Sequence, residues 1–154
     1  MLKNMTHSQG LNEGKRKTYP VITIGIVTKN DEETIAKTLS SLLNVDYPTN
    51  KFELVVVDGL SRDKTVEIAC STLEQAHFCW KLLSDEGRGL AYARQMVVEN
   101  ARGKYILWVD GDHIIPKNYA KNQVVFMEEN PSLGAAEALV VFEGNYIQRL
   151  EHYM

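Results

Sequence analysis

The 154-residue chain has few of the residues that mark specialised protein classes. Its two cysteines, Cys70 and Cys79, stand at no metal-like spacing, so nothing calls for a zinc motif or an oxidising compartment. We expect both thiols to be small core residues. The chain also lacks a basic excess: 17 Lys and Arg against 20 Asp and Glu leave a net charge of −3, which argues against a nucleic-acid partner.

Long hydrophobic runs are absent as well. No apolar run approaches the roughly 18 residues that span a bilayer, and the N-terminus lacks the apolar segment of a signal peptide. These absences favour a cytoplasmic location; the cytoplasmic membrane face is the alternative, because the basic residues at 15–17 could contact acidic lipid. We expect residues 1–18 to form a flexible polar tail and residues 19–154 to form one domain.

Short apolar runs alternate with segments of helical periodicity. The predicted strands are residues 21–27, 54–57, 78–83, 105–109 and 135–142. The apolar residues between them recur at helical spacing, and the predicted core faces of three helices are Ile35, Leu39, Leu42 and Leu43; Val66, Ala69, Cys70 and Leu73; and Leu90, Ala93, Val97 and Ala101. Asn30 or Asp31 is expected to cap the first helix. This alternation predicts an α/β fold with a mostly parallel sheet and flanking helices.

Polar residues gather at or just beyond the predicted strand ends: Thr28, Asn30, Asp58, Asp110 and Asp112. In open parallel sheets the ligand binds beyond the carboxyl ends of the strands, so we expect the functional site there. A carboxylate at position 58 could accept hydrogen bonds from a base or from ribose hydroxyls. The alternative interpretation of Asp58 is an ordinary turn residue.

Asp110 and Asp112 flank a glycine directly after a predicted buried strand. Two carboxylates one residue apart on a turn can face the same space, and Mg²⁺ or Mn²⁺ prefers such oxygen ligands together with substrate phosphates. The adjacent His113 could be a third ligand. The alternatives are two solvated acids and an exposed turn histidine.

Gly87-Arg88-Gly89 lies between a predicted strand and a predicted helix. It is a poor match to a dinucleotide fingerprint, because Tyr92 stands where the third glycine belongs and the loop follows the third strand. A nicotinamide-dependent oxidoreductase is therefore disfavoured. Arg88 and Arg94 could instead contact a phosphate or a sugar, although either could be a simple surface charge.

Four segments, residues 21–31, 54–65, 87–94 and 101–112, resemble in order the motifs of family 2 glycosyltransferases with a GT-A fold. The resemblance covers about residues 19–142. It implies a Rossmann-like nucleotide-diphospho-sugar transferase that needs Mn²⁺ or Mg²⁺ and usually inverts the anomeric carbon. By position, it implies that Thr28 and Asn30 line the nucleotide pocket, that Asp58 contacts the base, that Asp110 contacts the ribose or sugar, and that Asp112 binds the metal.

The same family places a catalytic carboxylate far downstream of the Asp-x-Asp pair, and here only 42 residues follow Asp112. We therefore expect a C-terminally incomplete domain whose catalytic base lies outside this chain. The acceptor stays open between a lipid phosphate and a polysaccharide, and the apolar C-terminal segment could support self-association. A non-catalytic module that binds nucleotide-sugars is the alternative function.

Overall fold

The computed structural model describes residues 19–137. Its four strands form one parallel sheet in the order β3-β2-β1-β4, namely β1 (Ile22–Thr28), β2 (Phe52–Asp58), β3 (Cys79–Ser84) and β4 (Tyr105–Asp110). The helices are α1 (Ile35–Leu43), α2 (Thr65–Leu73), α3 (Leu90–Asn100) and α4 (Tyr119–Glu129), with a short 3₁₀ helix, η1 (Thr49–Lys51), before β2. The predicted α/β architecture with a parallel sheet is confirmed.

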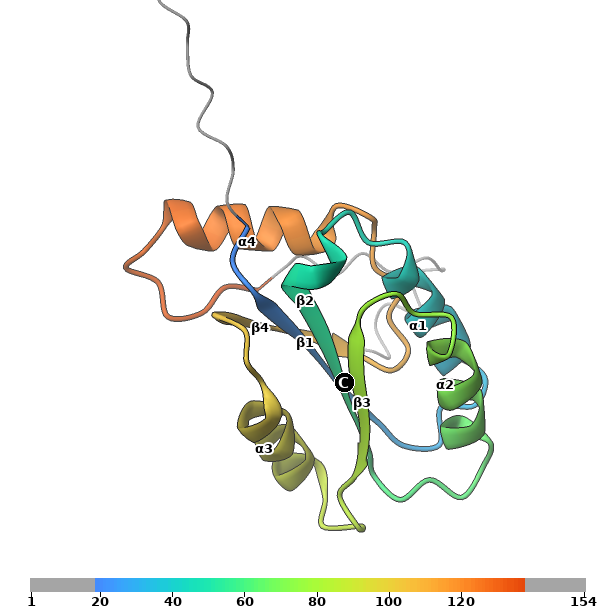
Figure 1. Cartoon of the computed structure of the whole chain (residues 1–154). Helices are drawn as coiled ribbons and strands as arrows, with labels where there is room; N and C mark the ends of the chain where they lie inside the picture. The colour runs from blue at the N-terminus through green and yellow to red at the C-terminus, as the bar shows by residue number, and fades with distance from the viewer. Residues whose placement is uncertain (1–18, 138–154) are drawn as a thin grey trace, which may run out of the picture.

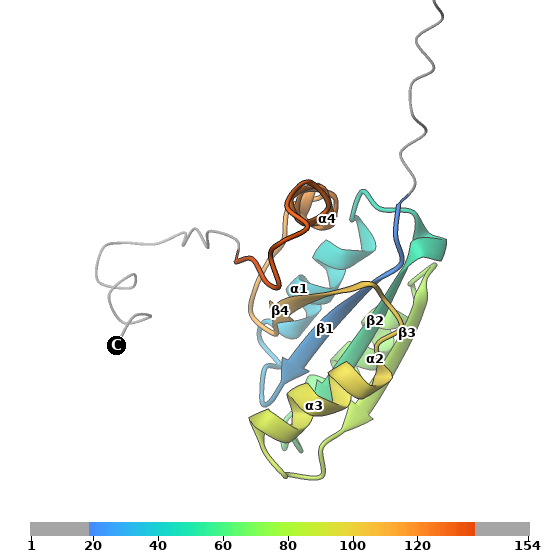
Figure 2. The same ribbon diagram turned by 90° about the vertical axis from the view of Figure 1, so that its left-hand side faces the viewer.

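Helices cover both faces of the sheet, α1 and α2 on one side and α3 on the other (Figures 1 and 2). Helix α4 contributes Ala120 and Val124 to the same core as α1. No helix among residues 19–137 is long and apolar enough to cross a membrane.

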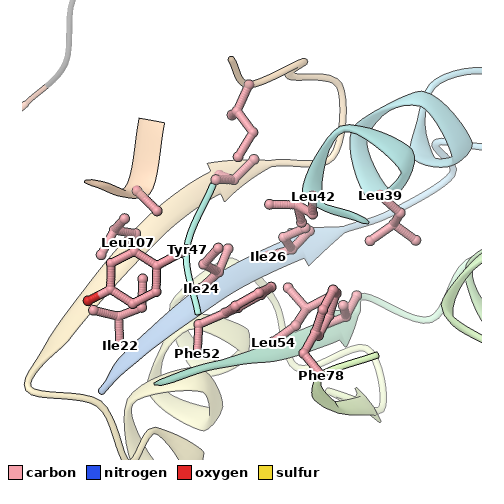
Figure 3. Close-up of a cluster of buried hydrophobic side chains, with 14 of the residues drawn as sticks. Ile22, Ile24, Ile26, Leu39, Leu42, Tyr47, Phe52, Leu54, Phe78 and Leu107 are labelled. Atoms are coloured by element: carbon pink, nitrogen blue, oxygen red, sulfur yellow. The ribbon is translucent and has the colours of Figure 1, made fainter. Parts of the chain in front are cut away.

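The two central strands carry apolar side chains to both faces, which explains why their sequences are nearly continuous apolar runs. On the α1 side, Ile22, Ile24 and Ile26 of β1 join the larger core, which also contains Leu54 (Figure 3). On the α3 side, β2 contributes to a smaller cluster made of Val55, Val57, Ala93 and Val97.

Gly25 lets α3 approach the sheet closely. A Cβ at this position would lie 2.6 Å from Cγ1 of Val97 and 3.2 Å from the ring of Trp108. Such short separations do not occur in packed interiors, so any larger residue would push the helix away from the sheet.

Several local predictions were wrong. Helix α1 begins at Ile35 without a side-chain cap, and the Asp31 carbonyl accepts hydrogen bonds from the amides of Thr34 and Ile35 in a preceding turn. Cys79 is exposed and Cys70 only half-buried, because β3 is an edge strand and α2 presents a narrow buried face.

The predicted core faces of the second and third helices also need correction. Val66 and Leu90 are exposed because they lie off the buried faces of their helices, and Ala101 lies just beyond the end of α3. The buried faces are Thr65, Ala69 and Leu73 in α2, and Ala93 and Val97 in α3. Residues 135–137 of the predicted fifth strand form no strand, and its residues 138–142 lie outside the described part of the chain.

Candidate functional site at the carboxyl edge of the sheet

The strand register brings the predicted polar residues to one edge of the sheet. Thr28 lies opposite Asp58, Asp58 lies opposite Ser84, and Asp110 pairs with Val27. The loops that follow β2 and β3 are seen at the bottom of Figure 1, opposite α4. Segments from four parts of the sequence therefore meet at the carboxyl edge, as the parallel topology predicts.

The loops after β1 and β2 are tied together by hydrogen bonds centred on Asn30. Its amide donates to Ser61 Oγ at 2.9 Å, and its side-chain Oδ1 accepts from the amide of Arg62 at 2.9 Å. The amide of Asp31 donates to Thr65 Oγ1 at 2.7 Å. Asn30 also has a φ of 56°, a left-handed conformation that asparagine tolerates better than most residues. Asn30 therefore holds two loops in place while remaining exposed itself.

A second link joins the same loops through carboxylates. The amide of Glu32 donates to Asp63 Oδ2 at 3.2 Å, and the amide of Lys64 donates to Glu32 Oε2 at 2.9 Å. Thr65 donates its hydroxyl to Asp63 Oδ1 at 2.6 Å, and this hydrogen bond is the main reason that the pKa of Asp63 is below its usual value. The carboxylate of Asp63 is thus kept charged at the start of α2, as expected from its position at a helix N-terminus.

Asp58 is buried, and its carboxylate accepts hydrogen bonds from both the amide and the hydroxyl of Ser61. Ser61 is also the acceptor for the backbone amide of Asn30. The Asp58 carboxylate therefore stabilises the β2 loop to which Asn30 is hydrogen-bonded. The Asp58 carboxylate is therefore hydrogen-bonded within the protein, and Asp58 lies at the end of β2, as the sequence predicts.

Thr28 is buried and donates its hydroxyl to Asp31 Oδ2 at 2.6 Å, while its carbonyl accepts from the amide of Gly59 at 2.8 Å. Gly111 lies directly against this pair: a Cβ there would come within 2.6 Å of Asp31 Oδ2. Its carbonyl accepts from Thr38 Oγ1 at 2.9 Å. The turn after β4 can approach the β1 loop only because position 111 has no side chain.

Asp110 and Asp112 differ from the other carboxylates at this edge. Their side chains are 63% and 56% exposed, and neither accepts a hydrogen bond within residues 19–137. His113 lies between them, with Nδ1 4.0 Å from Asp110 Oδ2 and Nε2 3.8 Å from Asp112 Oδ1. Burial, and then the charge of Asp110, raise the pKa of Tyr119, whose hydroxyl donates to the Trp108 carbonyl.

The carboxylates of Asp110 and Asp112 suit a hard divalent cation. Two free carboxylates on a turn leave coordination positions for phosphate oxygens and water, as Mg²⁺ and Mn²⁺ require. The described residues hold no cluster of three or more potential metal ligands, so the protein would supply a minority of the ligands. The sequence predicts the position of this pair and its neighbour His113, but not their hydrogen-bonding state.

Two hollows lie side by side at this edge and share Asn30. The cationic hollow, about 430 Å³, is lined by Lys29, Asn30, Leu60, Arg62 and Gly87. The acidic hollow, about 370 Å³, is lined by Asn30, Asp31, Glu32, Glu33, Thr34, Asp63 and Asp112. The site is therefore divided by charge, with positive side chains on one side of Asn30 and carboxylates on the other.

The two predicted arginines stack on aromatic rings. The guanidinium carbon of Arg88 lies 3.6 Å from the ring centre of Tyr92, and that of Arg94 lies 5.9 Å from the ring centre of Trp108. Neither lines the two hollows. Sequence reasoning missed Lys29 and Arg62, although Lys29 directly follows a strand end and so stood where a ligand contact is expected.

Comparison with known proteins gives the family of the chain. The sequence matches the family model described as Glycosyl transferase family 2 over residues 23–152, most of the chain. The chain belongs to glycosyl transferase family 2. This confirms the resemblance seen in its motifs.

Relatives of this family 2 chain include proteins named as glycosyltransferases. It is 32% identical over 107 residues to the poly(ribitol-phosphate) beta-N-acetylglucosaminyltransferase TarS of Staphylococcus aureus strain Mu50, covering 70% of this chain and 19% of the relative. It is 30% identical over 125 residues to the dolichyl N-acetyl-alpha-D-glucosaminyl phosphate 3-beta-D-2,3-diacetamido-2,3-dideoxy-beta-D-glucuronosyltransferase of Methanococcus voltae, covering 77% of this chain and 39% of the relative.

Solved structures show the same GT-A architecture. S. aureus TarS 1–349 in complex with UDP-GlcNAc matches with a TM-score of 0.64 and 31% identity, over 71% of this chain and 31% of that one. The Pyrobaculum calidifontis mannosyltransferase PcManGT in complex with GDP-Man and Mn²⁺ matches with a TM-score of 0.68 and 28% identity, over 72% of this chain and 33% of that one. The family 2 chain thus spans about a fifth to two fifths of these relatives and structures.

Proposed function

We propose that this chain supplies the nucleotide-sugar-binding region of a glycosyltransferase that works with a divalent cation, Mn²⁺ or Mg²⁺. The observation that carries the proposal is the charge division across Asn30 at the carboxyl edge of the sheet. A nucleotide-diphospho-sugar has two anionic phosphates, which can use cationic side chains at one end and a bound cation at the other.

On the acidic side, we assign Asp112 and Asp110 as the cation ligands; the described residues form no group of three potential ligands, so His113 is not assigned as a third ligand. Their carboxylates are exposed and free of hydrogen bonds within the described residues, which supports this assignment. A divalent cation held there would neutralise the charge that develops on the diphosphate leaving group. The exposed carboxylate of Asp110 is also assigned to accept hydrogen bonds from a ribose or sugar hydroxyl.

On the cationic side, the nucleotide would lie against Asn30 and Asp58, with Lys29 and Arg62 as additional contacts. The side-chain NH₂ group of the exposed Asn30 can donate to a base or phosphate, since within the described residues the side chain uses only its Oδ1. Asp58 would contact the nucleoside only if its carboxylate accepted a hydrogen bond from the ligand as well as those from Ser61. Thr28 is assigned a supporting role in this pocket because its hydroxyl already bonds to Asp31.

Arg88 and Arg94 complete the proposed anion contacts. Stacking on an aromatic ring leaves the guanidinium N–H groups free to bind phosphate or sugar oxygens. The names of two relatives refer to a phosphate-bearing polymer and a phosphate-bearing lipid. We therefore extend the proposal to a phosphate-bearing acceptor of one of these two kinds.

A thermal-shift screen tests the proposal directly. The chain is heated with UDP-, GDP- and dTDP-sugars, each in Mn²⁺ and in EDTA. A ligand at 100 times its Kd should stabilise the fold by about 2.7 kcal/mol. The proposal predicts a shift for at least one donor in Mn²⁺ that shrinks in EDTA, and the absence of a shift with every donor would contradict it.

A further inference from the structure

A buried carboxylate that the proposed chemistry does not use lies just after β3. Asp85 is 1% exposed and forms no ion pair within residues 19–137. Burying a charge without a partner is costly, so its carboxylate must be stabilised in another way. The sequence Asp-Glu-Gly-Arg-Gly gives no sign of this, because it is typical of an exposed loop.

Two backbone amides of the following loop stabilise the Asp85 carboxylate. The amide of Gly87 donates to Oδ1 at 2.7 Å, and the amide of Gly89 donates to Oδ2 at 2.9 Å. The Asp85 carbonyl accepts from the amide of Arg88 at 3.0 Å. Because Gly89 is the N-cap of α3, the charge also lies at the positive end of that helix.

The loop held in this way has an unusual backbone. Glu86, Gly87 and Gly89 have φ values of 54°, 78° and 96°. A non-glycine residue with positive φ costs free energy and persists only where the surroundings enforce it. The two hydrogen bonds to the Asp85 carboxylate help to enforce it here, together with the bond from the Glu86 amide to Ser84 Oγ at 3.2 Å.

The same loop forms one wall of the cationic hollow. Gly87 lines the hollow beside Leu60, and a Cβ at Gly87 would lie 3.3 Å from Leu60 Cδ2. At its base the loop is joined to the β2 end, since the amide of Asp85 donates to the carbonyl of Asp58 at 3.0 Å. The position of this wall therefore depends on Asp85.

We propose that Asp85 is a positioning residue that fixes the Gly87 wall of the cationic hollow and so sets the affinity for the nucleotide part of the donor. This inference rests on the proposed function. Asp85 itself does not touch the nucleotide, because its carboxylate is buried beneath the loop.

The test is calorimetric titration of UDP and GDP, in Mn²⁺, into wild type and Asp85→Asn. The asparagine keeps the volume of the side chain but turns an NH₂ group toward one of the two loop amides. Losing one charge-assisted hydrogen bond at a buried site should weaken binding of the nucleotide that the wild type prefers by roughly tenfold. Glu53→Gln is the matched control: Glu53 is another buried carboxylate, at the opposite edge of the sheet, and its variant should lose stability without losing affinity.

Gly87→Ala gives a second, independent test that leaves the carboxylate intact. Alanine disfavours a φ of 78° and adds a Cβ against Leu60, so the wall must move and binding should weaken. If both changes act through the wall, their effects in the double variant should be less than additive. Should Asp85→Asn fail to fold, unchanged binding in Gly87→Ala still overturns the inference, and weaker binding supports the role of the wall that Asp85 holds.

The outcomes separate the two proposals. If the wild type binds neither nucleotide, the proposed function and this inference both fail. If the wild type binds but the folded Asp85→Asn or Gly87→Ala protein binds equally tightly, the inference alone is overturned. Weaker binding in both, with the affinity of Glu53→Gln unchanged, supports the role of Asp85.

Discussion

The strands of the sheet begin at its amino edge and end at its carboxyl edge. Both edges carry carboxylates, but these carboxylates have different roles. At the amino edge, the buried Glu53 carboxylate accepts from Thr23 Oγ1 at 2.9 Å, from the Arg102 amide at 2.7 Å and from Arg102 Nε at 2.8 Å. Gly103 completes the network by donating its amide to Thr23 Oγ1 at 3.0 Å. At the carboxyl edge, the carboxylates of Asp110 and Asp112 are exposed and accept no hydrogen bond within the described residues.

The contrast shows what distinguishes a structural carboxylate from a ligand-binding one in this fold. A carboxylate whose oxygens are already saturated contributes to stability, and replacing it leaves buried donors unpaired. A carboxylate whose oxygens are free is available to a cation. Asp58 and Asp85 are intermediate, because they lie at the functional edge but bond to its loops.

The largest effect should come from Gly103→Ala at the amino edge. The added Cβ would lie 2.3 Å from the Thr23 amide nitrogen and 2.5 Å from the Ile22 carbonyl carbon, and backbone atoms cannot move aside. We expect a loss of roughly 4 kcal/mol or more in the free energy of unfolding, measured by urea denaturation. A loss under about 1 kcal/mol would show that the amino edge is less tightly packed than described.

Glu53→Gln should have the next largest effect on stability. Burial raises the pKa of Glu53, but hydrogen bonds from Arg102 and Thr23 outweigh it and hold the pKa below its ordinary 4.5. The charged form therefore stabilises the fold above about pH 4.5, and this contribution is lost as the pH falls through the depressed value. We expect a loss of about 1–3 kcal/mol at pH 7.

Urea denaturation of wild type and Glu53→Gln between pH 7 and pH 3 checks this prediction. The difference in unfolding free energy should be constant near neutrality and should shrink at the acid end, since glutamine does not titrate. A difference that grew on acidification would contradict the assigned direction of the pKa.

Asp58→Ala should act mainly on binding. We expect nucleoside diphosphate affinity to fall by roughly 1.5–3 kcal/mol, because a charged hydrogen-bonded group is lost. Ser61→Ala separates loss of the Asp58 carboxylate from loss of its hydrogen bond to the loop. It removes one donor to Asp58 but leaves the carboxylate in place. Unchanged nucleoside diphosphate affinity in Asp58→Ala, measured by calorimetry, would make Asp58 a turn residue only.

The sequence predicts much of the fold because the central strands are buried on both faces. The β-branched runs of β1 and β2 are typical of strands that are buried on both faces. Because helices alternate with these strands, the sheet is parallel, and the polar residues that follow each strand lie at one edge. Cys79 was misjudged because its exposure depends on β3 being at the edge of the sheet, which local sequence does not report.

The interior of the site was harder to predict, for a physical reason. The burial of Asp85 depends on amides of its own loop, which any sequence possesses. The roles of Asn30 and Ser61 depend on two loops that meet only after folding. An exposed cation such as Arg62 has the same sequence signature whether it lines a hollow or is merely solvated.

The most direct test of the account is the metal dependence of nucleotide binding. Calorimetry would compare UDP and GDP affinity in Mn²⁺ and in EDTA for wild type, Asp112→Ala and the control Asp46→Ala, whose exposed carboxylate pairs with Lys121 on α4. We predict that wild type and Asp46→Ala bind roughly tenfold or more tightly in Mn²⁺, and that Asp112→Ala loses this gain. Equal affinity in Mn²⁺ and EDTA for all three proteins would contradict the central claim.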